Sequence, residues 1–328
     1  MRKWGETSAL DLAKRFKNPL LRQALLTYTE LPDYSTIVLF MALAWHHQKH
    51  AGYAAGGSLE FARAIERRYL TLGGEVNYKS RVDRILVEND KAVGIRLNDG
   101  TEYRGDIVIS AADGRTTIFD MLVGKYTNDK IRGYYDNFPL FPPLIQIALG
   151  VARSFEDIPH LVSGINYPLK EPVTIAGQEL KRLGVHIYNY DPSGAPVGKT
   201  VLKVLLNTNY EYWKKLKQDP KCYKAEKKQI ADQVIALLEQ RFSGIADQVE
   251  MRDVATPMTW ERYTGNWQDS HEGWLMTTKN LNMRLSKTLP GLKNFYMAGQ
   301  WVEPGGSLPY VAVSGRNVIQ IICKQDKK

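Results

Sequence analysis

The chain of 328 residues contains only two cysteines, Cys222 and Cys323. Two cysteines are too few for a disulfide framework or a cysteine-rich metal cluster, so the sequence predicts a protein of the reducing cytoplasm. The longest apolar run, Ile37 to Trp45, is far shorter than the ~20 residues that a membrane-spanning helix needs. Met1-Arg-Lys is followed by polar sequence and not by the apolar core of a secretory signal. We therefore expect a soluble cytoplasmic protein, or one attached peripherally to a membrane.

Motifs of several enzyme classes are also absent from the sequence. No two glycines stand two positions apart, so there is no Gly-x-Gly and no first-turn fingerprint that seats a dinucleotide pyrophosphate. The Gly-x-Ser-x-Gly elbow of a serine hydrolase is missing as well. His46 and His50 are one helical turn apart, but no carboxylate or cysteine stands nearby at ligand spacing. We expect no metal site.

The formal net charge of +9 is spread along the chain and is densest between Lys203 and Lys228. Nucleic-acid binding needs a focused basic patch and a recognisable module, and the sequence shows neither, so no nucleic-acid partner is expected. A solvated helix face explains the lysines. Attraction to an anionic membrane surface is the alternative, and it gains weight if the substrate is lipid-like.

The N-terminal region is predicted to be helical, with no strand ahead of its helices. Ser8 and Asp11 resemble a capping box, Asn18-Pro19 begins a second helix, and Thr36 to His46 is an apolar helix. A longer amphipathic helix begins at Gly56-Gly57-Ser58 and ends at Gly73-Gly74. The apolar residues on one face of this helix are Ala62, Ile65, Tyr69 and Leu72.

A strand-rich block follows. The predicted strands are 75–78, a segment through Val82, Ile85 and Val87, and 92–97, with a turn at Asn89-Asp90 and a hairpin turn at Asp99-Gly100. The run from Asp106 to Ala112 is continuously apolar, which is typical of a strand buried on both faces. Asp113 is predicted to cap the short helix that follows it.

From Leu144 onward the pattern becomes antiparallel. Candidate long strands are 144–151, 185–190 and 200–207, followed by a helix over 225–242 and a strand over 249–255. The stretch from Thr256 to Trp267 then gathers aromatic residues around a proline. Its rings could wall an apolar pocket, and simple core packing explains them equally well.

The end of the chain predicts a strand, a glycine turn and a helix. Phe295 to Met297 is strand-like, Gly299 lets the chain leave the sheet, and Gly305-Gly306 open the helix. Free amides at a helix start, together with the positive end of its dipole, favour an anionic or electron-rich ligand. The same turn is also common for purely structural reasons.

Several of these segments, taken in order, resemble phytoene desaturase-related flavoproteins of the amine-oxidase-like FAD group. The segments are Gly56-Gly57-Ser58, Gly73-Gly74-Glu75, Arg81 to Ile85, Asp106 to Asp113, Asp191 to Lys199, Ala255 to Thr259 with Arg262-Tyr263, and Ala298-Gly299, Pro304 to Gly306 and Ser314 to Asn317. The resemblance covers nearly the whole chain from about Ser35 onward. Each motif is weak, but their shared order is fairly specific.

The resemblance implies an α/β (α+β) fold with a partial FAD-binding, Rossmann-like domain built from discontinuous segments and a mixed-sheet substrate domain with helices. It places substrate-domain helices at 1–50, the incomplete FAD-binding portion at 51–125 with 285–328, and the substrate-binding domain at 126–284. The residues it implies near FAD are Val82, Ala111, Ala112, Gly299, Gly305, Gly306, Ser307 and Leu308. Tyr263 and Trp267 are the candidates for a substrate pocket.

The implied chemistry is desaturation, saturation or isomerisation of a carotenoid-like isoprenoid by hydride transfer to or from flavin N5. No general base stands out, so no catalytic residue is named. The departure from the family is the missing first strand with its Gly-x-Gly-x-x-Gly turn. Either the chain is a fragment or one subunit of a split enzyme that needs a separate Rossmann half, or it is a truncated relative. A non-catalytic protein that binds an apolar ligand is the alternative function.

Overall fold

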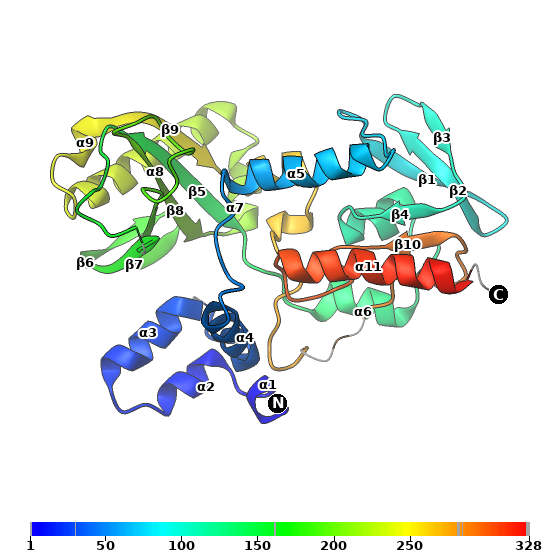
Figure 1. The fold of residues 1–328 in the computed structure, drawn as a ribbon, viewed down its shortest axis with the longest axis horizontal. Helices are drawn as coiled ribbons and strands as arrows, with labels where there is room; N and C mark the ends of the chain where they lie inside the picture. Colours follow the sequence, from blue (N-terminus) through cyan, green and yellow to red (C-terminus); the bar gives the residue numbers. More distant parts are fainter. Residues whose placement is uncertain (1, 30, 161, 281–282, 284, 326–328) are drawn as a thin grey trace. The chain divides into compact units, whose positions relative to one another are not determined.

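The computed structural model describes residues 2–29, 31–160, 162–280, 283 and 285–325 (Figure 1). The chain forms two compact units. Unit 1 contains Met1–Ala51, Asn77–Phe141 and Thr264–Lys328, and unit 2 contains Gly52–Val76 and Pro142–Tyr263. Helices and sheets are both well represented, in agreement with the predicted α/β (α+β) class. The two units divide the chain differently from the three predicted domains, and that domain division stays a prediction.

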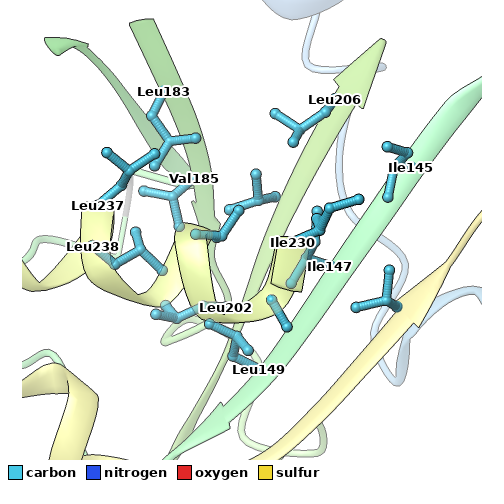
Figure 2. Close-up of a cluster of buried hydrophobic side chains, with 14 of the residues drawn as sticks. Ile145, Ile147, Leu149, Leu183, Val185, Leu202, Leu206, Ile230, Leu237 and Leu238 are labelled. Carbon is cyan, nitrogen blue, oxygen red and sulfur yellow. The ribbon is translucent and has the colours of Figure 1, made fainter. Parts of the chain in front are cut away.

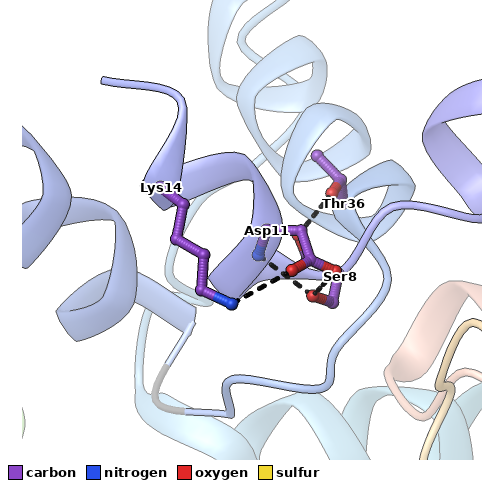
Figure 3. Close-up of polar contacts among 4 residues, drawn as sticks. All are labelled: Ser8, Asp11, Lys14 and Thr36. Carbon is purple, nitrogen blue, oxygen red and sulfur yellow. Dashed lines mark hydrogen bonds and ion pairs between the residues drawn. The ribbon is translucent and has the colours of Figure 1, made fainter. Parts of the chain in front are cut away.

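Unit 1 begins with the helices α1 (Arg2–Gly5), α2 (Ala9–Lys14), α3 (Pro19–Thr29) and α4 (Thr36–His47). The predicted cap of α2 is confirmed: Ser8 Oγ accepts a hydrogen bond from the Asp11 amide and donates one to Asp11 Oδ2 (Figure 3). Thr36, the first residue of α4, donates through Oγ1 to the carbonyl oxygens of Thr7 and Ser8. These bonds fix the start of α4 against the start of α2.

Unit 1 also contains two small sheets and four further helices. In the first sheet, β1 (Val82–Glu88), β2 (Lys91–Leu97) and β3 (Glu102–Arg104) pair antiparallel, and the predicted turns join them. In the second sheet, β4 (Val108–Ser110) and β10 (Phe295–Met297) pair parallel. The remaining elements are the π-helix η1 (Thr116–Met121), α6 (Asp129–Asn137), the 3-10 helix η2 (Trp267–Asp269) and α11 (Leu308–Gln325).

Two strand predictions in unit 1 were wrong in part or in full. Residues 75–78 form no strand, because no described strand lies beside them to pair with. The strand expected over 106–112 is only three residues long, and Ile109 at its centre is 43% exposed. A strand buried on both faces needs cover on both, and the described residues cover only one face of β4.

Unit 2 is built on a five-stranded sheet in the order β6-β7-β8-β5-β9. Its strands are β5 (Leu144–Val151), β6 (Gly164–Ile175), β7 (Gln178–Ile187), β8 (Thr200–Asn207) and β9 (Val249–Ala255). All four pairings are antiparallel, as the pattern after Leu144 predicted. The resemblance had implied a mixed sheet in this domain. Its helices are α5 (Gly57–Thr71), α7 (Tyr210–Leu216), α8 (Pro220–Glu239), α9 (Ile245–Gln248) and α10 (Pro257–Thr264).

The core of unit 2 lies between this sheet and α8 (Figure 2). Every second residue of β5 and β8 is buried, as period-two alternation requires. Ile230, Leu237 and Leu238 of α8 pack against that face. The sheet and α8 therefore make a two-layer scaffold with one continuous core.

Helix α5 forms at the predicted residues, but none of its residues is buried. The apolar side chains of its predicted stripe are instead open to solvent: Ile65 is 59% exposed, Tyr69 50% and Leu72 68%. An amphipathic helix ordinarily packs its apolar stripe against a partner. None of the residues that the structure describes covers this stripe.

Candidate cofactor and substrate site

The carboxyl ends of β4 and β10 meet at one edge of the parallel sheet. Ala111-Ala112 follow β4 and Ala298-Gly299 follow β10, and a Cβ placed on Gly299 would lie 3.8 Å from the Ala111 carbonyl oxygen. Both Ala111 and Ala112 are exposed. In open α/β sheets, ligands bind in the crevice beyond the carboxyl ends of the strands. The structure thus brings together three of the residues that the resemblance places near FAD.

Helix α11 is tied to the exit of β10 by Ser314. The Gly299 amide donates a hydrogen bond of 2.7 Å to Ser314 Oγ, and that hydroxyl donates one of 2.8 Å to the Val311 carbonyl. Ser314 is fully buried, so both bonds are shielded from water. As a result, the first turn of α11 is held at a fixed position relative to the end of the strand.

The turn before α11 has an unusual backbone. Gly305, Gly306 and Ser307 have φ values of 126°, 58° and 69° in succession. A serine rarely adopts a positive φ, and such strain occurs preferentially at functional sites. Ser307 and Leu308 are both exposed, Leu308 at 61%. The first residues of α11 are thus exposed, and the free amides of a helix start favour an anionic or electron-rich group.

Glu272 packs against this turn, which the sequence did not indicate. A Cβ placed on Gly306 would lie only 2.3 Å from Glu272 Oε2. Burial raises the pKa of the Glu272 carboxyl above its ordinary value of 4.5. The pKa of the nearby Tyr34 phenol is also raised. Burial is the main cause, and the charge of Glu272 adds to it. Position 306 therefore needs glycine for two reasons: its φ is positive, and the Glu272 side chain occupies the space that a Cβ would need.

The raised pKa makes a prediction for Glu272→Gln. Since the fold favours the protonated carboxyl, its contribution to stability is present below pH 4.5 and is lost as pH rises through the raised folded pKa. Glutamine does not titrate, so the variant should gain melting temperature relative to the parent between pH 4 and pH 8. Thermal melts across that range measure the difference in melting temperature between the variant and the parent. A gap that is constant with pH would show that the carboxyl is not desolvated.

Asp113 joins the site to a distant segment. Its Oδ1 accepts a hydrogen bond of 2.7 Å from the Thr116 amide, which confirms the predicted cap, although the helix that follows is a π-helix. Its Oδ2 accepts one of 2.9 Å from the Trp267 amide. Burial raises the pKa of this carboxyl, and its backbone hydrogen bonds act in the opposite direction. The carboxyl thus fixes Trp267 beside the end of β4.

Trp267 belongs to an aromatic cluster with Tyr135, Trp274 and Trp301. The ring of Tyr135 lies 5.7 Å from Trp267 and 5.0 Å from Trp274, and Trp274 and Trp301 are 5.2 Å apart. Trp274 also donates through Nε1 to the Trp301 carbonyl. Trp267 itself is half-buried. Three of these four rings were not singled out from the sequence, because they come from separate segments with no common period.

The other predicted positions belong to other elements of the chain. Val82 is a half-buried residue at the start of β1. Tyr263, on α10 of unit 2, is 75% exposed, with the Arg262 guanidinium 4.5 Å from its ring centre. A cavity of about 310 Å³ in unit 1 is lined by Tyr135, Trp301 and other residues, none of them from the predicted site. The roles assigned to the predicted site residues stay predictions.

In the described part of the chain, no three histidine, cysteine, aspartate or glutamate side chains are grouped so as to hold a metal ion. No described helix is both long enough and apolar enough to cross a membrane.

The strand ends, the strained glycine turn and the exposed helix start are features of α/β folds that bind nucleotides. They fit one side of an FAD cradle, because backbone amides and residues without bulky side chains line the approach. The chain belongs to the family of flavin containing amine oxidoreductases, whose family model matches residues 5–323.

Two relatives and one solved structure illustrate the likeness. The chloroplastic prolycopene isomerase of Arabidopsis thaliana is 26% identical over 281 residues, which are 84% of this chain and 46% of the isomerase. The neurosporene-forming phytoene desaturase of Rhodobacter capsulatus is 27% identical over 286 residues, 82% of this chain and 53% of the desaturase. The chain thus spans about half the length of these relatives. The cyclohexylamine oxidase of Brevibacterium oxydans shares the fold with a TM-score of 0.53 at 11% identity, over 100% of this chain and 69% of the oxidase.

Proposed function

We propose that this chain is the substrate-side and C-terminal portion of an FAD-dependent oxidoreductase that acts on an apolar, carotenoid-like isoprenoid. The observation that carries the proposal is the convergence of β4, β10 and the start of α11 at one edge of the parallel sheet. The names of the two relatives, a prolycopene isomerase and a phytoene desaturase, support the substrate class.

Bound FAD would supply a two-electron acceptor or donor for a hydride at a substrate carbon. The residues that would hold it are Ala111-Ala112 and Gly299 at the strand ends, the turn 305–307 and Leu308, with Val82 against the adenine. The amides at the start of α11 would stabilise negative charge without reorganisation, since Ser314 fixes the first turn of the helix in advance.

Within unit 1, the half-buried rings of Tyr135 and Trp267 offer an apolar surface, and the buried rings of Trp274 and Trp301 pack against Tyr135. A carotenoid-like chain has no charged group, so flat rings that exclude water are suited to hold it in register. In this proposal Trp267 lines the substrate path and Asp113 positions it through the backbone. Tyr263 is retained as a second pocket candidate. Peripheral attachment to a membrane would give access to such a substrate.

A second candidate function is a non-catalytic protein that binds an apolar ligand. The absence of Gly-x-Gly favours it, because a pyrophosphate turn is needed for tight dinucleotide binding. In the oxidoreductase proposal, a complementary Rossmann half supplies the missing pyrophosphate turn, and this chain is one part of the assembled enzyme.

An absorption spectrum discriminates between the two functions. The chain mixed with FAD and a complementary Rossmann segment, then passed through gel filtration, should retain flavin absorbance. Incubation with a polyene substrate should then shift the polyene spectrum, because adding or removing conjugated double bonds changes its absorption. If the polyene binds, its spectrum does not change and no flavin absorbance is retained under any condition, the non-catalytic alternative holds and the oxidoreductase proposal fails.

A further inference from the structure

Unit 1 contains a cavity beside α6, the α6 cavity, and its described lining residues include none of the predicted cofactor positions. Its volume is about 310 Å³, at the lower end of the range for small-molecule pockets. The lining comes from η1, the first turns of α6, the segment 285–290, and β10 with the residues that follow it. A cavity of this size has room for a molecule of one or two rings, and a long polyene does not fit inside it.

The walls of the α6 cavity are mainly apolar and include three aromatic rings. Tyr134 and Tyr135 are half-buried on α6, and Trp301 is buried. The rings of Tyr135 and Trp301 are stacked, with their centres 6.2 Å apart and 20° between their planes. Aliphatic side chains of the lining include Ile131, Leu289 and Met297. Flat aromatic ligands pack well against walls of this kind.

The polar groups of the lining favour a negative charge. Lys130, in the first turn of α6, is the only charged residue among the described lining residues, and no described acidic side chain forms an ion pair with it. Asp129, in the same turn, does not line the cavity. Ser286 and Thr288 add two hydroxyl groups whose oxygen atoms are 3.0 Å apart. An ammonium group and two hydroxyls can all donate hydrogen bonds to a carboxylate.

The wall formed by residues 285–290 is held in place within unit 1. The Met297 amide donates a 2.8 Å hydrogen bond to the Lys287 carbonyl, and Lys287 Nζ forms a 2.6 Å ion pair with Glu303. The Lys287 side chain is 12% exposed and that of Glu303 is 23% exposed, so this pair is shielded from water. On the α6 wall, Asn128 caps the helix through its side-chain oxygen. A site that is formed in advance binds more tightly, because less ordering is needed.

The indole N–H of Trp301 is an unsatisfied donor. It is buried, and no described residue accepts a hydrogen bond from it. Buried polar groups of folded proteins are nearly always hydrogen-bonded, and an unpaired donor costs free energy. Because Trp301 lines the α6 cavity, an occupant with an oxygen acceptor would offset this cost.

We propose that the α6 cavity binds a small aromatic carboxylic acid, with its ring against Tyr135 and Trp301 and its carboxylate toward Lys130. The apolar walls select the ring, and the single cation selects the negative charge. This site goes beyond the proposed function. It shares Tyr135 and Trp301 with the aromatic cluster, whereas Trp267, the ring assigned to the substrate path, does not line it.

The test uses the 328-residue chain in buffer without FAD or polyene. The probes are 2-naphthoate and its neutral counterpart 2-naphthalenemethanol, which share one ring system. Isothermal titration calorimetry should show saturable 1:1 binding of both. We expect naphthoate to bind about threefold to fivefold more tightly, the effect of one partly exposed ion pair. Amide hydrogen exchange should slow at residues 128–135 and 285–290 when naphthoate is bound.

Two variants separate the charge of the site from its space. Lys130→Gln should lose the preference for naphthoate and bind the alcohol as the parent does. Ile131→Trp enlarges a half-buried lining residue and should weaken the binding of both probes at least about tenfold. The matched control is Lys324→Gln, at an exposed lysine of α11 outside the lining, and it should bind both probes as the parent does.

Several results would overturn the inference. They are no saturable binding of naphthoate, an unchanged preference for naphthoate in Lys130→Gln, or protection confined to other segments. An equal loss of affinity for both probes in Lys130→Gln would show that the lysine acts on the fold and not on the charge. Circular dichroism and melting show whether Ile131→Trp folds, and if it does not, Lys130→Gln alone decides. None of these results involves flavin, so they leave the proposed function untouched.

Discussion

Gly306→Val is expected to remove flavin from any preparation in which the parent chain retains it. The added Cβ would lie 2.3 Å from Glu272 Oε2, and valine does not tolerate the φ of 58°. The turn must move, and with it the amides that precede α11. Absorbance of the purified protein measures the loss. We also expect a lower melting temperature, because a left-handed valine costs roughly 1–3 kcal/mol.

The matched control for this experiment is Gly315→Ala on the same helix. A Cβ at Gly315 meets no atom within 4 Å. Alanine in a helix interior is favoured over glycine by about 1 kcal/mol, so this variant should retain flavin and melt slightly higher. Flavin content equal to the parent in Gly306→Val would refute the assignment of the turn to the cofactor.

Trp213→Ala is expected to give the largest loss of stability in unit 2. Trp213 is fully buried, its Nε1 donates a 2.9 Å hydrogen bond to Thr208 Oγ1, and its ring meets those of Tyr212 and Tyr223 edge-on. Removing a buried tryptophan side chain typically costs about 3–5 kcal/mol, since both burial and packing are lost. Denaturant unfolding followed by circular dichroism measures the change.

Tyr263→Ala provides the comparison for Trp213→Ala. Tyr263 is another aromatic residue of unit 2, but it is 75% exposed, so its removal should change the free energy of unfolding by less than about 0.5 kcal/mol. A similar loss of unfolding free energy in both variants would contradict the prediction, because it would mean that burial of Trp213 does not stabilise unit 2.

The sequence predicted elements well where a local pattern decided the structure. The strands β5, β8 and β9 begin and end at the predicted residues. In β5 and β8 every second residue is buried, whereas β9 is buried only at its last two residues, Val254 and Ala255. The cap at Ser8 and the strand β10 also formed as expected. By contrast, β6 was not predicted and β7 only in part. In β6, Ile165, Tyr167 and Leu169 alternate with exposed residues and pack against the core. Two prolines, Pro168 and Pro172, lie within this strand, and proline in a run argues against a strand when the sequence is considered alone.

The candidate site was predictable only in its backbone. Glycines at 299, 305 and 306 and the helix after them are visible as a local pattern. The structure places Gly299 just after β10, and Gly305 and Gly306 in the turn before α11. The position of Glu272 against Gly306 depends on how two distant loops pack, which no spacing reveals. The same holds for the second hydrogen bond of Asp113, made to a residue 154 positions away.

The pairing of β4 with β10 also constrains the order in which the chain can fold. The five-stranded sheet of unit 2 lies between these two strands in the sequence, so a ribosome delivers it before β10 emerges. Domains generally fold as units during synthesis, and contacts between distant residues form slowly. The nascent chain must therefore hold β4 without β10 while the five-stranded sheet folds, and the edge that β4 and β10 share is assembled only after Phe295–Met297 have emerged.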